Sequence, residues 1–249
     1  MNESPRHVPL EAVHNFRDIG GYRARDGAFV KHNLVYRADG LYRLSSTDME
    51  TIRQIGIKTV IDLRTEKELS DNGTFPVDQH PVDFHNVSLM DDIWEEADIP
   101  HFNSIADFLV WGYRDIMKNA HDRFARAFDL VAQHEAPPVV YHCAAGKDRT
   151  GLLTMMLLGS LGVSRDDIVH DYALSAEAMK RLQEWVLKTN PEREHVITDA
   201  PAHFLAAEPD AMHAIIDDFT AGHSDFADAV IAYGISEDSI ERLHSFMLT

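Results

Sequence analysis

Three short apolar runs in the first 150 residues have the length and the residue types of buried strands. They are residues 34–37, 58–63 and 139–141, with the sequences LVYR, KTVIDL and VVY. Short β-branched runs bounded by helix or turn signals are typical of strands covered on both faces. Asp62 and Arg64 lie near the end of the second run, and α/β sheets usually build their sites at the carboxyl ends of strands.

Amphipathic stretches between and after these runs predict helices. Ser45 and the acidic residues after it are typical of a helix start, and Gly56 ends that helix. The segment 150–161 is apolar on nearly every face, which predicts a central, buried helix. Pro137 and Pro138 separate an earlier helix from the third strand. The expected helices cover residues 45–54, 104–119, 121–134, 150–161, a segment starting at Ser164, 173–188, and two or three segments within 201–249 with breaks at Gly222 and Gly234.

This order of strands and helices predicts an α/β fold with a small central sheet flanked by helices. No linker divides the chain, so we expect a single domain over residues 1–249. Residues 65–103 are acidic and without clear periodicity, and we expect them to be irregular. We expect an inserted lid at about residues 76–120.

Charge narrows the classes of partner. The chain carries 41 acidic and 23 basic residues, a formal net charge of -18. Such a surface repels nucleic acid and anionic membranes, although a small positive pocket can still capture an anion. The first eighteen residues have no continuous apolar run like that of a secretory signal, and residues 151–161 are too few to span a bilayer. We expect a cytoplasmic protein without stable membrane insertion, and leaderless secretion stays open.

Cysteine and histidine usage narrows the chemistry. Cys143 is the single cysteine, so the chain has neither an intramolecular disulfide nor a multi-cysteine zinc site. The fifteen histidines include no H-E-x-x-H pattern, because His134 and Glu135 are followed by Ala-Pro-Pro. Lys147 is followed by Asp148 rather than Ser or Thr, so no Walker A motif is present. We expect neither a metal nor a cofactor.

The segment that follows the third strand carries the strongest chemical signal. It reads His-Cys-Ala-Ala-Gly-Lys-Asp-Arg-Thr and leads directly into the apolar helix. A loop that curls at a helix N-terminus turns backbone N–H groups inward, and with the helix dipole they bind anions. Gly146 gives the loop its conformational freedom, and the planar fork of Arg149 can hold two phosphoryl oxygens. The same field lowers the pKa of a cysteine from about 8.5 to roughly 3.5–7.5, which makes Cys143 a candidate nucleophile.

The loop HCAAGKDRTG resembles that of the bacterial atypical tyrosine and phosphoinositide phosphatases, a family sometimes called triple-specificity phosphatases. Further segments of the chain resemble that family: NFRDIGGY, YRADGLYRL, GIKTVIDLRTEKE and, near the end, YGISEDSIERL. Residues 90–102 match nothing in it. The resemblance implies a tyrosine-phosphatase α/β core with helical lid elements, a phosphocysteine intermediate and no metal. It also implies phosphorylated proteins, phospholipids or small phosphate esters as substrates.

The family pattern suggests roles for other residues of the loop. Members of this type carry Lys and Asp inside the loop, which places an acid beside the leaving group. We therefore expect Asp148 to be the general acid, with a salt bridge to Arg149 or to a lid residue as the alternative. Asp62 competes for the role of acid, but we favour a role in orienting Arg149. Lys147 could contact a second phosphate or an inositol substituent, or be a solvated lysine at the rim.

The remaining loop positions are expected to bind substrate: Ala144, Ala145 and Gly146 through their backbone, and Thr150 near the thiolate. The Thr150 hydroxyl could donate to Cys143 or cap the helix. His142 is expected to bond to loop carbonyls, because a thiolate needs no base.

Several residues outside the loop have a structural and a functional interpretation. Arg17 and Asp18 resemble family residues near the loop, and we expect a structural salt bridge. Trp94, Trp111 and Tyr113 could line a lid, although core packing is the usual role of such rings.

Two other function classes compete with a phosphatase. A Cys–His acyl hydrolase would leave the G-K-D-R-T segment without a purpose. A phosphate-binding pseudoenzyme is disfavoured by the presence of both Cys143 and Arg149.

Overall fold

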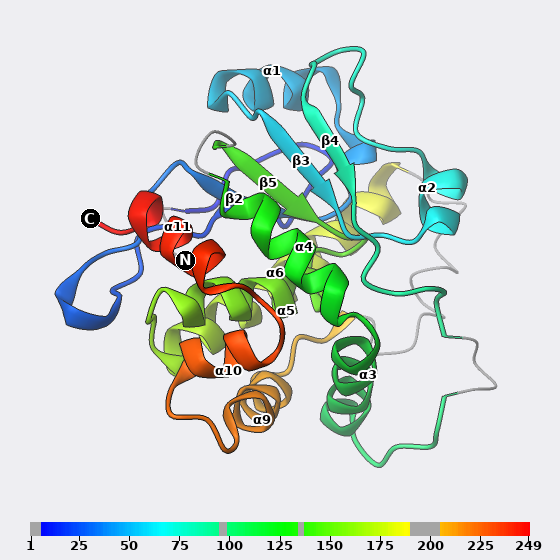
Figure 1. The fold of residues 1–249 in the computed structure, drawn as a ribbon. Helices are drawn as coiled ribbons and strands as arrows, with labels where there is room; N and C mark the ends of the chain where they lie inside the picture. Colours follow the sequence, from blue (N-terminus) through cyan, green and yellow to red (C-terminus); the bar gives the residue numbers. More distant parts are fainter. Residues whose placement is uncertain (1–5, 95–98, 134–136, 190–204) are drawn as a thin grey trace.

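Five strands form one sheet at the centre of the computed structural model, which describes residues 6–94, 99–133, 137–189 and 205–249 (Figure 1). The strand order is β1-β2-β5-β3-β4. β1 pairs with β2 in antiparallel fashion, and the other neighbours are parallel. The strands are β1 (Arg17–Asp18), β2 (Val35–Ala38), β3 (Thr59–Asp62), β4 (Asp83–Asn86) and β5 (Val139–His142). β5 is therefore the middle strand, and its carboxyl end lies at the centre of the molecule.

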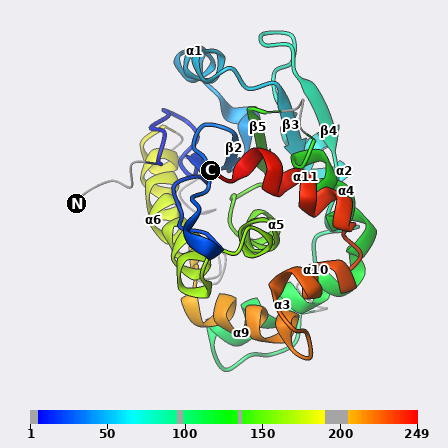
Figure 2. The ribbon, with the colours of Figure 1, turned by 60° about the vertical axis from the view of Figure 1, so that its left-hand side comes forward.

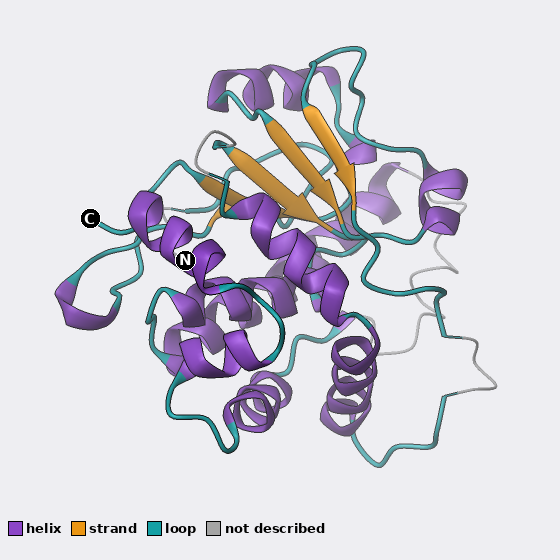
Figure 3. Cartoon of the chain, in the orientation of Figure 1, coloured by secondary structure: helices purple, strands orange, loops and turns teal. Residues whose placement is uncertain are grey.

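Helices supply the rest of the described fold (Figure 3). The α-helices are α1 (Ser46–Ile55), α2 (Glu66–Asn72), α3 (Ile105–Asn119), α4 (His121–Val131), α5 (Asp148–Ser160), α6 (Arg165–Thr189), α9 (Pro209–Thr220), α10 (Phe226–Ala232) and α11 (Glu237–Met247). Two short 3-10 helices are η1 (Arg25–Gly27) and η2 (Leu41–Arg43). None of these described helices is long and apolar enough to cross a membrane.

Alternation along the strands divides the core between the two faces of the sheet. Val139 and Tyr141 of β5 belong to a large apolar cluster with residues of α4 and α5, whereas Val140 belongs to a smaller one with Met49 and Ile52 of α1. Successive side chains of a strand point to opposite faces, so one short strand anchors both layers. The near-continuous apolar sequence of β5 follows from this burial on both sides.

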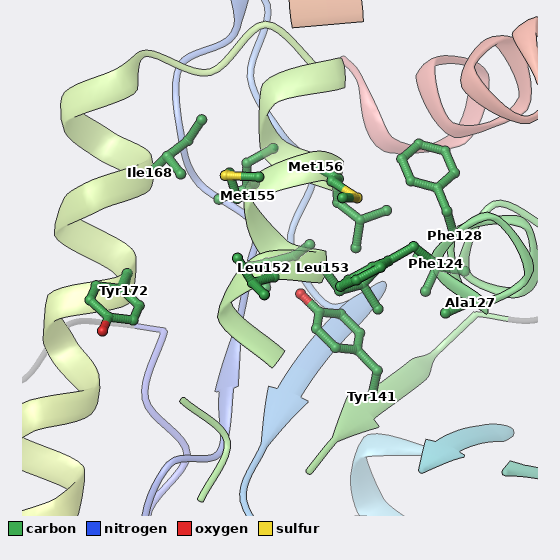
Figure 4. Close-up of a cluster of buried hydrophobic side chains, with 14 of the residues drawn as sticks. Phe124, Ala127, Phe128, Tyr141, Leu152, Leu153, Met155, Met156, Ile168 and Tyr172 are labelled. Atoms are coloured by element: carbon green, nitrogen blue, oxygen red, sulfur yellow. The ribbon is translucent and has the colours of Figure 1, made fainter. Parts of the chain in front are cut away.

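Helix α5 lies in the middle of the larger layer, as its apolar sequence predicts. All of its residues from Arg149 to Ser160 are buried. Figure 2 shows α5 nearly end-on, with other helices of the layer around it. Figure 4 shows Leu152, Leu153 and Met156 of this helix packed towards Tyr141 of β5 and Phe124 and Phe128 of α4. The start of α5 is thus held firmly at the carboxyl end of β5.

The described fold corrects several boundaries. Residues 65–103 are not simply irregular, because they include α2 and the edge strand β4. Within the range of the expected lid, 76–120, residues 83–86 form β4 of the central sheet, and the lid itself stays a prediction. The two helices expected after Ser164 are one helix, α6. Three helices follow in the C-terminal segment, as expected, while His134 and residues 201–204 lie outside the described part.

Candidate active site

The loop between β5 and α5 turns its carbonyl groups away from its concave side. We call residues 143–149 the cysteine loop. His142 Nδ1 lies 3.2 Å from the carbonyl oxygen of Cys143, and the backbone N–H of Gly40 donates to Ala144 O at 3.1 Å. The Asn15 side-chain amide donates to the carbonyls of Ala145 at 3.0 Å and Gly146 at 2.9 Å. Arg37 Nη2 also donates to Gly146 O, at 2.8 Å.

This outward arrangement of carbonyls fixes the direction of the N–H groups. In a trans peptide, the C=O of one residue and the N–H of the next are held in one plane and point in opposite directions. Because the carbonyls of residues 143–146 are held from outside, the N–H groups of residues 144–147 point the other way. The free N–H groups of the first turn of α5 add to them. The cysteine loop therefore forms a cradle for an anion.

Gly146 is required at its position for two reasons. Its φ of 63° is in the left-handed region, which side chains disfavour. A Cβ atom there would also lie 2.4 Å from the carbonyl oxygen of Ala38. Both the left-handed turn of the loop and the close approach of β2 therefore require a glycine at this position.

A buried ionic cluster supports the cysteine loop from behind. The Asp171 carboxylate of α6 contacts Arg37 at 2.5 Å, Arg17 at 3.2 Å and Arg6 at 3.3 Å. Burial alone would raise the pKa of Asp171, but Arg17 and Arg37 outweigh it and hold the pKa well below its ordinary value. The guanidinium groups of Arg17 and Arg37 share this one carboxylate, so the pair carries more positive than negative charge next to the cysteine loop. Arg37 connects this cluster directly to the loop through its bond to Gly146.

The expected salt bridge of Arg17 is present, with Asp171 as its partner. Asp18 has a different role. Its carboxylate accepts from the backbone N–H groups of Gly20 and Asn33, both at 2.8 Å, and lies 2.9 Å from His32. Arg17 therefore belongs to the loop support, whereas Asp18 orders the turn after β1.

Arg149 is held by Glu68, not by Asp62. Arg149 Nη1 lies 2.5 Å from Glu68 Oε2, and Nη2 lies 2.8 Å from Oε1. Burial alone would raise the pKa of Glu68, but the hydrogen bonds and charge of Arg149 outweigh it and lower the pKa. The Asp62 carboxylate accepts instead from Arg64 Nη2 at 2.6 Å and lies 3.4 Å from His142 Nε2. The expectation that Asp62 orients Arg149 is corrected by these contacts.

A cavity of about 220 Å³ opens over the cysteine loop. Cys143 lies on its floor, with 1% of its surface exposed. We call this cavity the cysteine pocket. Its lining is largely apolar, with the charged groups gathered near the cysteine. It is formed by Glu68, Met90, Ile93, Trp94, Phe108, Leu109, Gly112, Tyr113, Ile116, Cys143, Ala144, Ala145, Asp148 and Arg149.

The aromatic residues named from the sequence divide between this pocket and its surroundings. Trp94 and Tyr113 line the cavity. Trp111 packs against Trp94, with ring centroids 5.1 Å apart, and against Phe102 and Phe108. Trp94 lies close over Gly112, where a Cβ atom would be 2.8 Å from its ring. The rings of Trp94, Phe102, Phe108 and Trp111 pack together against α3, and we call them, with the apolar lining residues of the cysteine pocket, the apolar wall.

Asp148 lies beside the cysteine in the same pocket, with its side chain 33% exposed. The Tyr113 hydroxyl donates to Asp148 Oδ1 at 2.6 Å. Asp148 is the first residue of α5, so it lines the cavity from the end of the cysteine loop. The expected role of Asp148 as the general acid stays a prediction.

Lys147 and Thr150 differ from their expected environments. Lys147 is not a solvated lysine at the rim, because it is 1% exposed and its Nζ donates to Ala206 O at 2.6 Å. Its Nζ also lies 3.5 Å from Asp148 Oδ1. Thr150 does not cap the helix, since Lys147 holds the N-cap position of α5. Thr150 Oγ1 is buried without a hydrogen-bond partner in the described part of the chain, so the expected bond from Thr150 to Cys143 is not formed in this structure either.

Some residues that build the site carry no local signal of this role. Glu68 reads as the last residue of a T-x-x-E capping box at Thr65, which it also forms. Asn15, Arg37 and Asp171 gave no indication of a contact with the loop. Among the described residues, no group of three or more His, Cys, Asp or Glu side chains has the arrangement of a metal site.

Comparisons with known proteins agree with this geometry. Residues 8–249 match the sequence profile of a tyrosine phosphatase family. A tyrosine-protein phosphatase of Nostoc commune is 32% identical over 145 residues, which cover 58% of this chain and 49% of the relative. The triple specificity protein phosphatase PtpB of Mycobacterium tuberculosis is 29% identical over 202 residues, covering 70% of this chain and 71% of the relative.

The match with the Nostoc relative thus spans about half of that protein's length. Among solved structures, the catalytic core of Siw14 has a TM-score of 0.38 and 15% identity, over 81% of this chain and all of that one. That structural likeness is too weak to bear on activity.

Proposed function

This chain belongs to the tyrosine phosphatase family, and from that premise we propose that it hydrolyses phosphate monoesters through a phosphocysteine intermediate on Cys143. The observation that carries the proposal is the cysteine loop itself. Its N–H groups face one side because Asn15, Gly40 and Arg37 hold its carbonyls on the other. A cysteine on the floor of such a cradle, beside a guanidinium held in place, suits attack on a phosphoryl group.

In the first step, the Cys143 thiolate attacks phosphorus. A sulfur–phosphorus bond forms as the bond from phosphorus to the leaving oxygen breaks. The loop N–H groups and Arg149 neutralise the charge on the three phosphoryl oxygens. Asp148, which lines the same pocket, gives its proton to the leaving oxygen.

In the second step, water attacks the phosphocysteine. Asp148, now a carboxylate, takes a proton from the water. The sulfur–phosphorus bond breaks, inorganic phosphate leaves and the Cys143 thiolate is restored. The cycle needs no redox change and no further reactant.

The apolar wall of the cysteine pocket suits an ester with a hydrophobic group. Phe108, Leu109 and Trp94 offer van der Waals contact to a phenyl ring, as in phosphotyrosine. Phosphoserine or phosphothreonine, phosphoinositides and small phosphate esters are further candidate substrates, and the mycobacterial relative is named a triple specificity protein phosphatase. The net charge of -18 disfavours nucleic acid as a partner. A reducing cytoplasm would keep the single thiol active.

Hydrolysis of para-nitrophenyl phosphate by the whole chain tests the proposal. We expect turnover in the presence of excess chelator, because the loop amides and Arg149 supply the charge that a metal would otherwise provide. Cys143→Ser should abolish turnover while still binding phosphate. Turnover that needs an added divalent ion would contradict this mechanism.

The same assay separates the competing functions. A Cys–His acyl hydrolase would cleave para-nitrophenyl acetate in preference to the phosphate. A phosphate-binding pseudoenzyme would bind phosphate and cleave neither ester.

A further inference from the structure

Two tyrosines form a hydrogen-bonded chain that ends on Asp148. The Tyr113 hydroxyl lies 2.6 Å from Asp148 Oδ1 and 2.6 Å from the Tyr172 hydroxyl. Tyr113 comes from α3, Tyr172 from α6 and Asp148 from the start of α5. Tyr172 is labelled in Figure 4 on the helix beside α5. Three helices therefore meet at one carboxylate.

The direction of this chain follows from the number of protons available. A phenol has one O–H to donate. Burial first, and then the charge of Asp148, raise the pKa of Tyr113 well above its ordinary value, so it stays a phenol. Since an ionised carboxylate only accepts hydrogen bonds, the single O–H of Tyr113 is the donor in its bond to Asp148. Tyr172 must then be the donor in the bond between the two hydroxyls.

The two carboxylate oxygens of Asp148 are consequently unequal. Oδ1 accepts from Tyr113 and lies 3.5 Å from Lys147 Nζ. Oδ2 accepts no hydrogen bond from any described residue. When the carboxyl group takes up a proton on Oδ2, the chain from Tyr172 through Tyr113 is undisturbed. A proton on Oδ1 would force both tyrosines to reverse, and Tyr172 has no other described acceptor.

We infer that Tyr113, supported by Tyr172, is a positioning residue for the acid of the reaction: it holds Oδ1 so that the transferable proton resides on Oδ2. The inference rests on the proposed function, and in particular on Asp148 as the acid. It assigns to α3 a second role besides lining the pocket. The orientation of an acid on the cysteine loop depends on a helix that lies outside the loop.

The experiment is a double-mutant cycle between Tyr113→Phe and Asp148→Asn. The measured quantity is kcat/KM for aryl phosphates whose leaving groups range from nitrophenol to phenol. Tyr113→Phe should lower kcat/KM for phenyl phosphate about tenfold, the equivalent of one hydrogen bond, and change para-nitrophenyl phosphate much less. In an Asp148→Asn background, the same substitution should add no further dependence on the leaving group. Tyr172→Phe should give a weaker effect in the same direction.

Tyr233→Phe is the matched control. Tyr233 also donates a phenolic hydrogen bond to α3, to Met117 O at 2.5 Å, but it does not line the cysteine pocket. It should lower Tm without changing the dependence on the leaving group. If Tyr113→Phe lowers all substrates by one factor, or if its effect adds fully to that of Asp148→Asn, the inference is overturned.

Failure of the proposed function has a different signature. A wild-type chain without phosphatase activity would overturn both proposals. A wild-type chain that is active, and inactive as Cys143→Ser, but whose Asp148→Asn variant is indifferent to the leaving group, would overturn this inference and leave the phosphatase proposal standing.

Discussion

Arg149 and Glu68 form a two-point ion pair although 81 residues separate them along the chain. Glu68 Oε2 also accepts from the backbone N–H of Thr65, so the carboxylate is itself fixed at the start of α2. Arginine has five N–H donors in one plane. Two of them bind Glu68, and three are left for phosphoryl oxygens. The guanidinium is therefore oriented before a substrate arrives.

Glu68→Gln should lower kcat/KM for every phosphate ester by a similar factor, about 10–100-fold, because it loosens the clamp without touching the acid. Asp62→Asn is the matched control, since it removes a buried carboxylate that pairs with Arg64 instead. It should change stability more than turnover. Steady-state kinetics with activated and unactivated esters measure both. If Asp62→Asn proved the more damaging to catalysis, Glu68 would not be the orienting residue.

Arg149→Lys should lower kcat/KM by about 10²–10³-fold, because lysine keeps the charge but loses the fork that matches two oxygens. It also loses the two-point contact with Glu68. Arg114→Lys serves as the control, since Arg114 is an exposed arginine of α3 paired with Asp218. Near-native turnover of Arg149→Lys would show that the clamp lies elsewhere.

Asp148→Asn should slow phenyl and alkyl phosphates by about 10²–10⁴-fold, the usual range for loss of a general acid. Activated aryl phosphates need less protonation of the leaving oxygen, so they should lose much less. The plot of log kcat/KM against leaving-group pKa should therefore become steeper. The assignment would be reversed if Asp62→Asn gave the steeper plot and Asp148→Asn did not.

Asp171→Asn should lower the free energy of unfolding by about 3–5 kcal/mol, because it removes the carboxylate that the buried Arg17 and Arg37 share. Asp218→Asn, which breaks an exposed pair, should cost no more than about 1 kcal/mol. Urea unfolding at pH 7 measures both. If the two substitutions lowered the free energy of unfolding equally, the buried cluster would stabilise the fold no more than an exposed ion pair does.

The contacts of Asp171 also predict how the stability of the fold depends on pH in acid. The folded-state pKa of Asp171 is depressed. Its stabilising contribution is therefore complete above the unfolded pKa of about 3.9 and is lost as the pH falls towards the folded value. The wild-type chain should lose stability below about pH 4, and Asp171→Asn should show a flatter profile there.

The sequence was most informative where the residues of the candidate site are consecutive in the chain. The residues from Cys143 to Thr150 form one loop, so their spacing alone predicts an anion cradle after a strand. The buried helix after it and the strand before it followed from the same apolar runs. The acidic stretch was harder, since the sequence Asp-Phe-His-Asn of β4 has no β-branched residue. An edge strand is defined by its pairing with β3, which the sequence does not display.

The supporting residues were hidden for a different reason. Glu68 has a local role in the capping box with Thr65, so nothing in the sequence indicates that it also pairs with a distant arginine. Asp171 occupies an ordinary polar position in a long helix, and its meaning appears only when the fold brings Arg17 and Arg37 to it. Such roles depend on contacts across more than 80 residues, which periodicity cannot reveal.

The reacting groups and the apolar lining of the cysteine pocket come from different segments of the chain, and this affects how the substrate selectivity of the pocket can change. The proposed nucleophile, the N–H groups of the loop, the proposed clamp and the proposed acid all lie within seven consecutive residues. The apolar wall comes from separate segments, the stretch around Met90 and Trp94 and the face of α3. Substitutions in the wall at positions other than Tyr113 can therefore change the range of accepted esters while the residues of the cysteine loop stay the same. Directed evolution of this chain towards bulkier esters should begin at Ile93, Trp94 and Phe108.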